Sequence, residues 1–190
     1  MKYLALDLET SGMASTYDQI FQIGAAVMDS DGNVTDTFSK RIHPHAKTKF
    51  SIEALQVQWG EITPDTLKAW AETVLKAETS IQVFEQFRDW AAPYSKLPVI
   101  AWNANFDRAF FAQWRFQNKS RCVGTSVLSP VWICAMETAM NCPIHAGKSM
   151  GLDNIALHYG MTRSDAHNAL EDAVLAGMVY NRLIKEEKTQ

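Results

Sequence analysis

Two acidic side chains interrupt a segment that otherwise has the pattern of a buried β-strand. Residues 3–10 read YLALDLET, and their apolar side chains alternate onto both faces, which is typical of a strand covered on both sides. Asp7 and Glu9 lie two positions apart, so both project from the same face. Carboxylates on one buried face repel each other and lose hydration. The pair favours a bound hard cation; the alternative is an edge strand whose acids face solvent or pair with Lys or Arg.

The segment after this strand predicts a β-hairpin. An apolar run over residues 20–28 is followed by the dipeptide Asp31-Gly32 and by a second strand pattern over residues 34–42. Residues 50–77 predict a loop with short helical turns, and residues 81–90 have helical apolar spacing. Strands first, then strands alternating with helices, predict an α/β domain with a mixed sheet.

The second half of the chain continues this alternation. Residues 97–103 predict a short buried strand, and a helix pattern follows through residues 106–114. Residues 118–130 are polar and predict a loop, whereas residues 132–140 and 151–160 predict two short helices. A long helix closes the chain. With 190 residues, the sequence predicts one domain over residues 1–190.

Two more acidic residues lie where this organisation predicts a site. Asp107 stands between a predicted strand and the helix after it, although an Asp there can also be a helix N-cap. Strand ends that face helix starts are where open α/β sheets bind ligands. Asp172 shares one stripe of the last helix with Ala176, Val179 and Leu183, so it faces inward and needs a partner. No basic residue shares that stripe near it.

A histidine precedes the last helix. Asn168 and Glu171 form a capping pattern, so we expect the helix to begin just after Asn168, with His167 before it in extended chain. An imidazole with a pKa of about 6.5 can take up a proton near neutral pH. The alternative is a histidine with only a structural role in the core or at the surface.

Composition sets limits on the protein's environment. The three cysteines are odd in number and lack paired metal-ligand spacing, so we expect free thiols in a reducing cytoplasm and neither a zinc site nor a disulfide framework. No apolar stretch reaches the roughly 18 residues of a membrane span. The net charge of −3 does not exclude nucleic acid, because two divalent cations held by four carboxylates would reverse its sign.

Three short motifs then carry a family resemblance. The segments DLETSG, NANFD and HNALED resemble, in order and spacing, the three motifs of the DEDDh exonucleases, the DnaQ-like superfamily. Residues 19–44 and 151–161 are also similar to the family's second and third strands and to the helix before its last motif. The resemblance implies a ribonuclease H-like α/β fold, in which a central mixed five-stranded sheet has helices on both faces.

The resemblance also implies an activity and its residues. It implies a 3′-5′ exonuclease that hydrolyses single-stranded DNA or RNA from the 3′ end and releases nucleoside 5′-monophosphates, with two divalent cations, Mg²⁺ or Mn²⁺. Asp7, Glu9 and Asp172 would bind one ion, Asp7 would bridge to the second, and Asp107 would act directly or through water. His167 would be the general base.

Substrate contacts follow from the same resemblance. Thr10 and Gly12 match positions whose backbone meets the terminal nucleotide, and Met13 matches an apolar wedge against its base. Trp59 and Phe106 are candidates for base stacking, with a core position as the alternative. Tryptophans at positions 59 and 102 stand where many relatives have histidine, which leaves substrate specificity open.

Other interpretations remain open at this stage. The chain could be a catalytically silent scaffold that binds nucleic acid or a polymerase partner, or a nuclease that cuts internally. Some relatives are homodimers, so a homodimer is one further expectation. Basic side chains near the motifs could follow the phosphate backbone or be ordinary surface charges: Arg115, Lys119, Arg121, Lys148 and Arg163.

Overall fold

The computed structural model describes residues 2–119, 126–163 and 167–187. Its centre is a five-stranded sheet in the order β3-β2-β1-β4-β5. The first three strands, β1 (Lys2–Thr10), β2 (Ile20–Asp29) and β3 (Val34–Arg41), are antiparallel. The short strands β4 (Val99–Ala101) and β5 (Trp132–Cys134) run parallel to β1. The mixed five-stranded sheet expected for a ribonuclease H-like fold is therefore present.

The predicted hairpin joins β2 and β3. The Asp29 carboxylate accepts hydrogen bonds from the backbone of Asp31 and Asn33, at 2.9 and 3.0 Å, which closes the turn. Gly32 has a φ of 93°, a conformation that favours glycine. Local turn chemistry alone therefore accounts for this part of the prediction.

Seven α-helices are present in the described residues. Three precede β4: α1 (Ile52–Trp59), α2 (Pro64–Leu75) and α3 (Ser80–Ala91). The others are α4 (Ala104–Gln117), α5 (Ala135–Met140), α6 (Leu152–His158) and α7 (Ala169–Glu187). None of the helices in these parts of the chain is long and apolar enough to cross a membrane.

Residues 50–77 form two regular helices, so the expectation of a loop with short helical turns was wrong. Ser51 caps α1 by accepting from the backbone of Ala54, and Thr63 caps α2 in a reciprocal pair with Thr66. Pro64 stands at the first position of α2, where its missing N–H costs nothing. These capping signals predict helices even where apolar periodicity is weak.

Residues 132–140 were also assigned wrongly from the sequence. The first three residues form β5, which pairs in parallel with β4, and only Ala135–Met140 is helical. A three-residue strand is too short to show alternation, so its pairing partner decides its structure.

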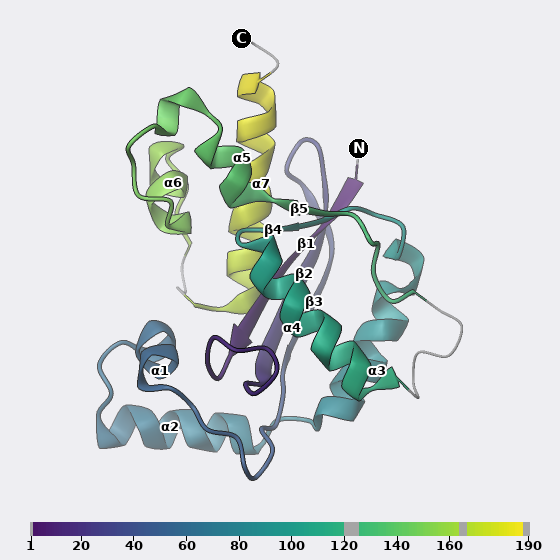
Figure 1. Ribbon diagram of the computed structural model, residues 1–190, viewed down its shortest axis with the longest axis vertical. Helices are drawn as coiled ribbons and strands as arrows, with labels where there is room; N and C mark the ends of the chain where they lie inside the picture. Colours follow the sequence, from purple (N-terminus) through teal and green to yellow (C-terminus); the bar gives the residue numbers. More distant parts are fainter. Residues whose placement is uncertain (1, 120–125, 164–166, 188–190) are drawn as a thin grey trace.

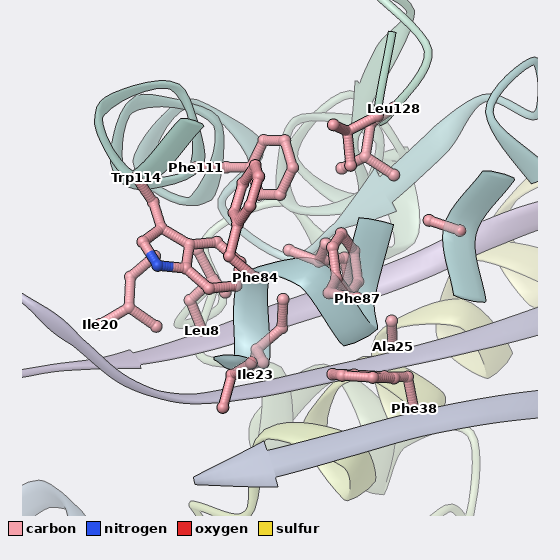
Figure 2. Close-up of a cluster of buried hydrophobic side chains, with 14 of the residues drawn as sticks. Leu8, Ile20, Ile23, Ala25, Phe38, Phe84, Phe87, Phe111, Trp114 and Leu128 are labelled. Atoms are coloured by element: carbon pink, nitrogen blue, oxygen red, sulfur yellow. The ribbon is translucent and has the colours of Figure 1, made fainter. Parts of the chain in front are cut away.

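The two faces of the sheet are covered by different helices (Figure 1). Leu4, Leu6 and Leu8 point from β1 into a core with the aromatic side chains of α3 and α4. Figure 2 shows Phe84, Phe87, Phe111 and Trp114 gathered over Leu8 and Ile23. Tyr3 and Ala5 point to the opposite face, where α7 packs. Thus β1 is buried on both sides, as its sequence predicts.

Helix α7 approaches the sheet closely at two glycines. A Cβ added to Gly24 of β2 would lie 2.2 Å from the backbone of Ala169 and Leu170. A Cβ on Gly177 would lie 2.5 Å from the sulfur of Met28. The Gly24 contact is with backbone, so a side chain there would push the first turn of α7 away from the sheet, whereas the flexible Met28 side chain can move away from Gly177.

Candidate active site

The acidic pair of β1 lies under α7. Tyr3, on the same face as Asp7 and Glu9, donates its hydroxyl hydrogen bond to the Gly177 carbonyl of α7 at 2.9 Å. Asp7 is partly buried, and Glu9 is buried. In the β1–β2 ladder Asp7 is opposite Gly24, the glycine against which α7 begins. The first turn of α7 is therefore brought directly to the acidic end of β1.

Asp107 reaches the same place because β4 is short. Only Leu4 and Ala5 of β1 pair with β4, so the β1 backbone further along has no strand on that side. The Leu8 backbone N–H donates to the Asp107 carboxylate. Asp107 lies in the first turn of α4 and is buried. It is not the N-cap, which is Asn103, so the alternative raised for this residue was wrong.

Asp172 and His167 come from the start of α7. The helix begins at Ala169, as expected, and the Asn168 side chain accepts from the backbone of Leu170 at 3.1 Å. Asp172 is buried on the inward stripe with Ala176, Val179 and Leu183. His167 is in a turn with a φ of 62°, so the expectation of extended chain was wrong. That turn brings Glu9, His167 and Asp172 together, with ligand atoms within 4.8 Å of one another.

The carboxylates are close enough to change one another's protonation. Burial raises the pKa of Asp7 well above its ordinary value, and the negative charges of Asp107, Glu9 and Asp172 raise it further. Burial raises the pKa of Asp107 from 3.8 to about 7. The metal-free protein thus holds these acids together at an electrostatic cost, which bound cations would relieve.

One of the basic candidates, Arg163, lies in this site as the partner of Asp172, a role that sequence reasoning did not give it. Arg163 donates to the Asp172 carboxylate, and its other terminal nitrogen lies 2.8 Å from Asp153 of α6. Burial raises the pKa of Asp172, and the Arg163 guanidinium opposes that rise. Arg163 does not share the α7 stripe; it comes from the loop before the helix, where no periodicity could reveal it. Its side chain is only 8% exposed, so the alternative of an ordinary surface charge was wrong, and a contact with the phosphate backbone stays a prediction.

The donor set fits hard divalent cations. Four carboxylates and one imidazole line the end of β1, and Mg²⁺ and Mn²⁺ prefer oxygen ligands. Mutual repulsion among these acids, which raises the pKa of Asp7, is the observation that supports the fit. Arg163 pairs with Asp172, and its positive charge also opposes the rise in the pKa of Asp7.

A pocket of about 220 Å³ adjoins Glu9. Four of the five residues expected to bind substrate line it: Thr10, Gly12, Met13 and Phe106. Thr10 donates its hydroxyl hydrogen bond to the Gly12 carbonyl at 2.7 Å, and Met13 is 81% exposed. Phe106 is partly buried and also packs against the aromatic core. The side chain of Trp59, the fifth residue, lies outside the described part of the structure.

The start of α1 completes this pocket, which the sequence did not suggest. Ser51, Glu53 and Ala54 form its other wall, and the Ser51 backbone N–H donates to the Ser11 carbonyl at 2.8 Å. That bond joins the loop after β1 to α1. The only sequence signal was the cap at Ser51, which marks a helix but not its neighbour.

The other basic candidates do not gather at the carboxylates in the described residues. Lys119 lies over the Phe116 ring, and Lys148 lies 3.2 Å from the His158 imidazole. Arg115 is exposed in the last turn of α4. Arg121 lies outside the described residues.

Sequence relatives share the whole length of the chain. Residues 2–183 match the family described as 3′-5′ exoribonuclease Rv2179c-like domain. The PolC-type DNA polymerase III of Staphylococcus haemolyticus is 26% identical over 186 residues, 98% of this chain. The PolC-type enzyme of Staphylococcus aureus is 24% identical over 186 residues. The chain spans only 12% of the length of each of these polymerases.

Solved structures show the same fold. The nuclease domain of 3′hExo, a DEDDh family member bound to rAMP, has a TM-score of 0.70 at 16% identity, covering 97% of this chain and 92% of that one. E. coli exonuclease I in complex with a dT13 oligonucleotide has a TM-score of 0.71 at 18% identity, covering 99% of this chain and 42% of that one. The chain belongs to the 3′-5′ exoribonuclease Rv2179c-like domain family, and it shares its fold with the DEDDh family member 3′hExo.

Proposed function

We propose that this protein is a metal-dependent 3′-5′ exonuclease that removes nucleoside 5′-monophosphates from the 3′ end of single-stranded RNA. The observation that carries the proposal is the convergence of Asp7, Glu9, Asp107 and Asp172, from three elements, at the end of β1. The choice of RNA rests on the family description. Single-stranded DNA is the second candidate, because the polymerases that resemble the chain act on DNA.

The carboxylates would hold two divalent cations, Mg²⁺ or Mn²⁺. Such ions stabilise the attacking and leaving oxygens of a phosphodiester when both are bound. Asp7 lies among the other acids and is the residue we propose to contact both ions. Glu9 and Asp172 would bind one of these ions. Asp107 would act directly or through a water molecule. Arg163 would then share Asp172 with a cation.

His167 is the general base in this proposal. Its imidazole lies with Glu9 and Asp172, where it can accept a proton from the water that attacks the phosphorus. The left-handed backbone at this residue aims the ring at the carboxylates instead of along the chain.

The 220 Å³ pocket beside Glu9 would hold the terminal nucleotide. Met13 and Phe106 offer apolar surface to a base, and stacking of this kind does not depend on base identity. A polymerase partner, a homodimer and a cytoplasmic location stay predictions. The free thiols of Cys134 and Cys142 support a reducing compartment.

A degradation time course tests the activity and its direction. Matched single-stranded RNA and DNA with a 5′ label are incubated with the protein and Mg²⁺, and EDTA is added to parallel samples. We expect a ladder that shortens from the 3′ end, RNA degraded faster than DNA, and no products with EDTA. A labelled circular RNA should stay intact, because an exonuclease needs an end.

Two variants distinguish this activity from a contaminating nuclease. Asp7→Asn should remove the ladder, because the central ligand loses its charge. Asp31→Asn changes an exposed acid in the β2–β3 turn and should leave the ladder unchanged. A folded wild-type protein that binds RNA without shortening it would instead support the silent scaffold, and cleavage of the circle would support an endonuclease.

A further inference from the structure

A second group of metal-binding residue types lies away from the carboxylates. Cys142, His145 and Glu186 have ligand atoms within 4.8 Å of one another. Cys142 and His145 belong to the 3₁₀ turn after α5 (Pro143–His145, with Cys142 as its N-cap), and Glu186 lies in the last turn of α7. Figure 1 shows α5 and α6 beside the end of α7 that is opposite its first turn. The cluster is therefore separate from the proposed active site.

Hydrogen bonds already draw this cluster around one tyrosine. The Tyr159 hydroxyl donates to a Glu186 carboxylate oxygen at 2.7 Å and lies 2.9 Å from His145 Nε2. The Cys142 thiol lies 3.7 Å from the same carboxylate oxygen. A thiol and an imidazole from one turn and a carboxylate from α7 thus lie close together around the Tyr159 hydroxyl.

Burial makes the polar atoms of the cluster costly without a further partner. His145 is fully buried, and Cys142 is 4% exposed. The Nδ1 atom of His145 is buried and has no hydrogen-bond partner among the described residues. Hydrogen bonds from these residues therefore satisfy only one of its two ring nitrogens, whereas buried polar atoms are normally all paired.

The donor types select the metal. Thiolate and imidazole are the ligands of structural zinc sites, and a carboxylate can complete such a set. Mg²⁺, with its preference for oxygen, would not select a thiolate. We propose that Cys142, His145 and Glu186 form a zinc site, with the Tyr159 hydroxyl orienting His145 and Glu186 from outside or serving as a further ligand.

This site would fasten the end of α7 to the segment around α5 and α6. Both sides already share an apolar core that contains Cys142, Ile155 and Leu183. Binding displaces the thiol proton of Cys142, so the thiolate charge and the Glu186 carboxylate balance the ion. The sequence expectation excluded zinc because no paired spacing was present. The proposal reverses it, because the third ligand lies far along the chain.

Cobalt substitution reads out thiolate ligation directly. Reduced, chelator-treated protein is titrated with Co²⁺ and followed by absorption spectroscopy. We expect a near-ultraviolet thiolate-to-cobalt band that saturates at one thiolate-bound ion per chain and is abolished by Zn²⁺. Ions at the carboxylates of the nuclease site are not expected to produce this band, because that site contains no thiol among the residues that the structure describes. The experiment is thus independent of the proposed nuclease activity.

Matched variants identify the residues that bind the cobalt ion responsible for the band. Cys142→Ser should lose the cobalt band. Cys134→Ser changes a buried cysteine whose thiol donates a hydrogen bond to the Trp102 carbonyl, and this variant should keep the band. Glu186→Gln, which can still accept from Tyr159, should lose the band at Co²⁺ concentrations that saturate the wild type. Zinc should raise the melting temperature of wild-type protein more than that of folded Glu186→Gln, in which only the nuclease-site carboxylates would still bind the ion. Wild-type protein without the band, or folded Cys142→Ser that keeps it, would overturn the proposal.

Discussion

The guanidinium of Arg163 donates to the carboxylate of Asp172 at the start of α7. Their side chains are only 8% and 10% exposed, so the pair is largely removed from water. The other terminal nitrogen of Arg163 contacts Asp153. The Arg163 Nε atom is buried and has no hydrogen-bond partner among the described residues. One guanidinium therefore neutralises part of the negative charge of this acidic site.

Replacing Arg163 should lower the stability of the metal-free protein and increase the stabilisation that Mg²⁺ provides. Arg163→Met leaves Asp172 buried without its cationic partner, so we expect a loss of about 3 kcal/mol in the free energy of unfolding with EDTA. A bound cation would no longer compete with the guanidinium. The rise in melting temperature caused by Mg²⁺ should thus be larger in the variant, as measured by differential scanning calorimetry.

The matched control for this change is Arg88→Met. Arg88 pairs with Asp89 at 2.7 Å, but Asp89 is 68% exposed, and such surface pairs contribute at most about 1 kcal/mol. This variant should respond to Mg²⁺ as the wild type does. Equal Mg²⁺ responses of Arg163→Met and wild type would show that the guanidinium does not compete with the cation.

His167 should affect rate more than binding. We expect His167→Asn to lose roughly 10²–10⁴-fold in single-turnover rate, the usual effect of removing a general base. Asparagine tolerates the left-handed backbone at this position, so the variant should fold. Binding of a phosphorothioate RNA, measured by fluorescence anisotropy, should change little. His45→Asn alters an exposed imidazole and serves as the control; similar rates for both variants would refute the base assignment.

Gly24 should be intolerant of even one methyl group. The Cβ of Gly24→Ala would collide with the backbone of Ala169 and Leu170, so α7 must shift or the core must strain, at a cost of about 3 kcal/mol. Because Asp172 moves with α7, Mg²⁺ affinity should fall too. In Gly151→Ala the added Cβ would meet only the tip of the Asn154 side chain, at 3.2 Å, so little change is expected. Urea unfolding and Mg²⁺ calorimetry provide both measurements, and a Gly24→Ala protein with wild-type Mg²⁺ affinity would contradict this role of the glycine.

The metal-free protein should become less stable as pH rises because of Asp107. Burial raises the pKa of Asp107 from 3.8 to about 7, so between these values the folded protein keeps a proton that the unfolded chain has lost. The folded state then binds more protons, and the free energy of unfolding falls with rising pH over this window. Thermal unfolding with EDTA between about pH 4 and pH 8, a range that covers this window, measures the fall in stability.

Asp107→Asn isolates this contribution from other carboxylates. Asp36 and Glu78, whose pKa values are lowered by hydrogen bonds to Tyr94 and Lys40, change stability in the opposite direction at lower pH. The variant keeps these groups, so its advantage over wild type should grow as pH rises from 4 toward about 7. A constant difference between the two proteins across that range would contradict the raised pKa.

Part of the fold followed from local sequence signals. The β2–β3 hairpin depends on turn chemistry at Asp31-Gly32, and the start of α7 depends on the Asn168 cap. The acids of β1 and α7 stood out because charges on apolar faces conflict with burial. Each of these signals is contained within a few neighbouring residues, so it can be recognised without knowing the rest of the fold.

Other features depended on partners that are distant in sequence. β5 is a strand because β4 is beside it, and Asp107 reaches Leu8 because β4 ends early. The positive partner of Asp172 came from a loop, where side-chain direction follows no period. The ring of His167 is aimed by a left-handed turn that the sequence pattern assigned to extended chain.

The sequence by itself determined which residue types could perform the chemistry and on which kinds of element they lie, because periodicity and capping are short-range properties. Only the tertiary structure decided which of them meet. The close approach at Gly24 places Asp172 beside Asp7, and the end of α7 places Glu186 beside Cys142 and His145. Such proximity results from packing of whole elements against one another, and that depends on the entire core rather than on any one segment.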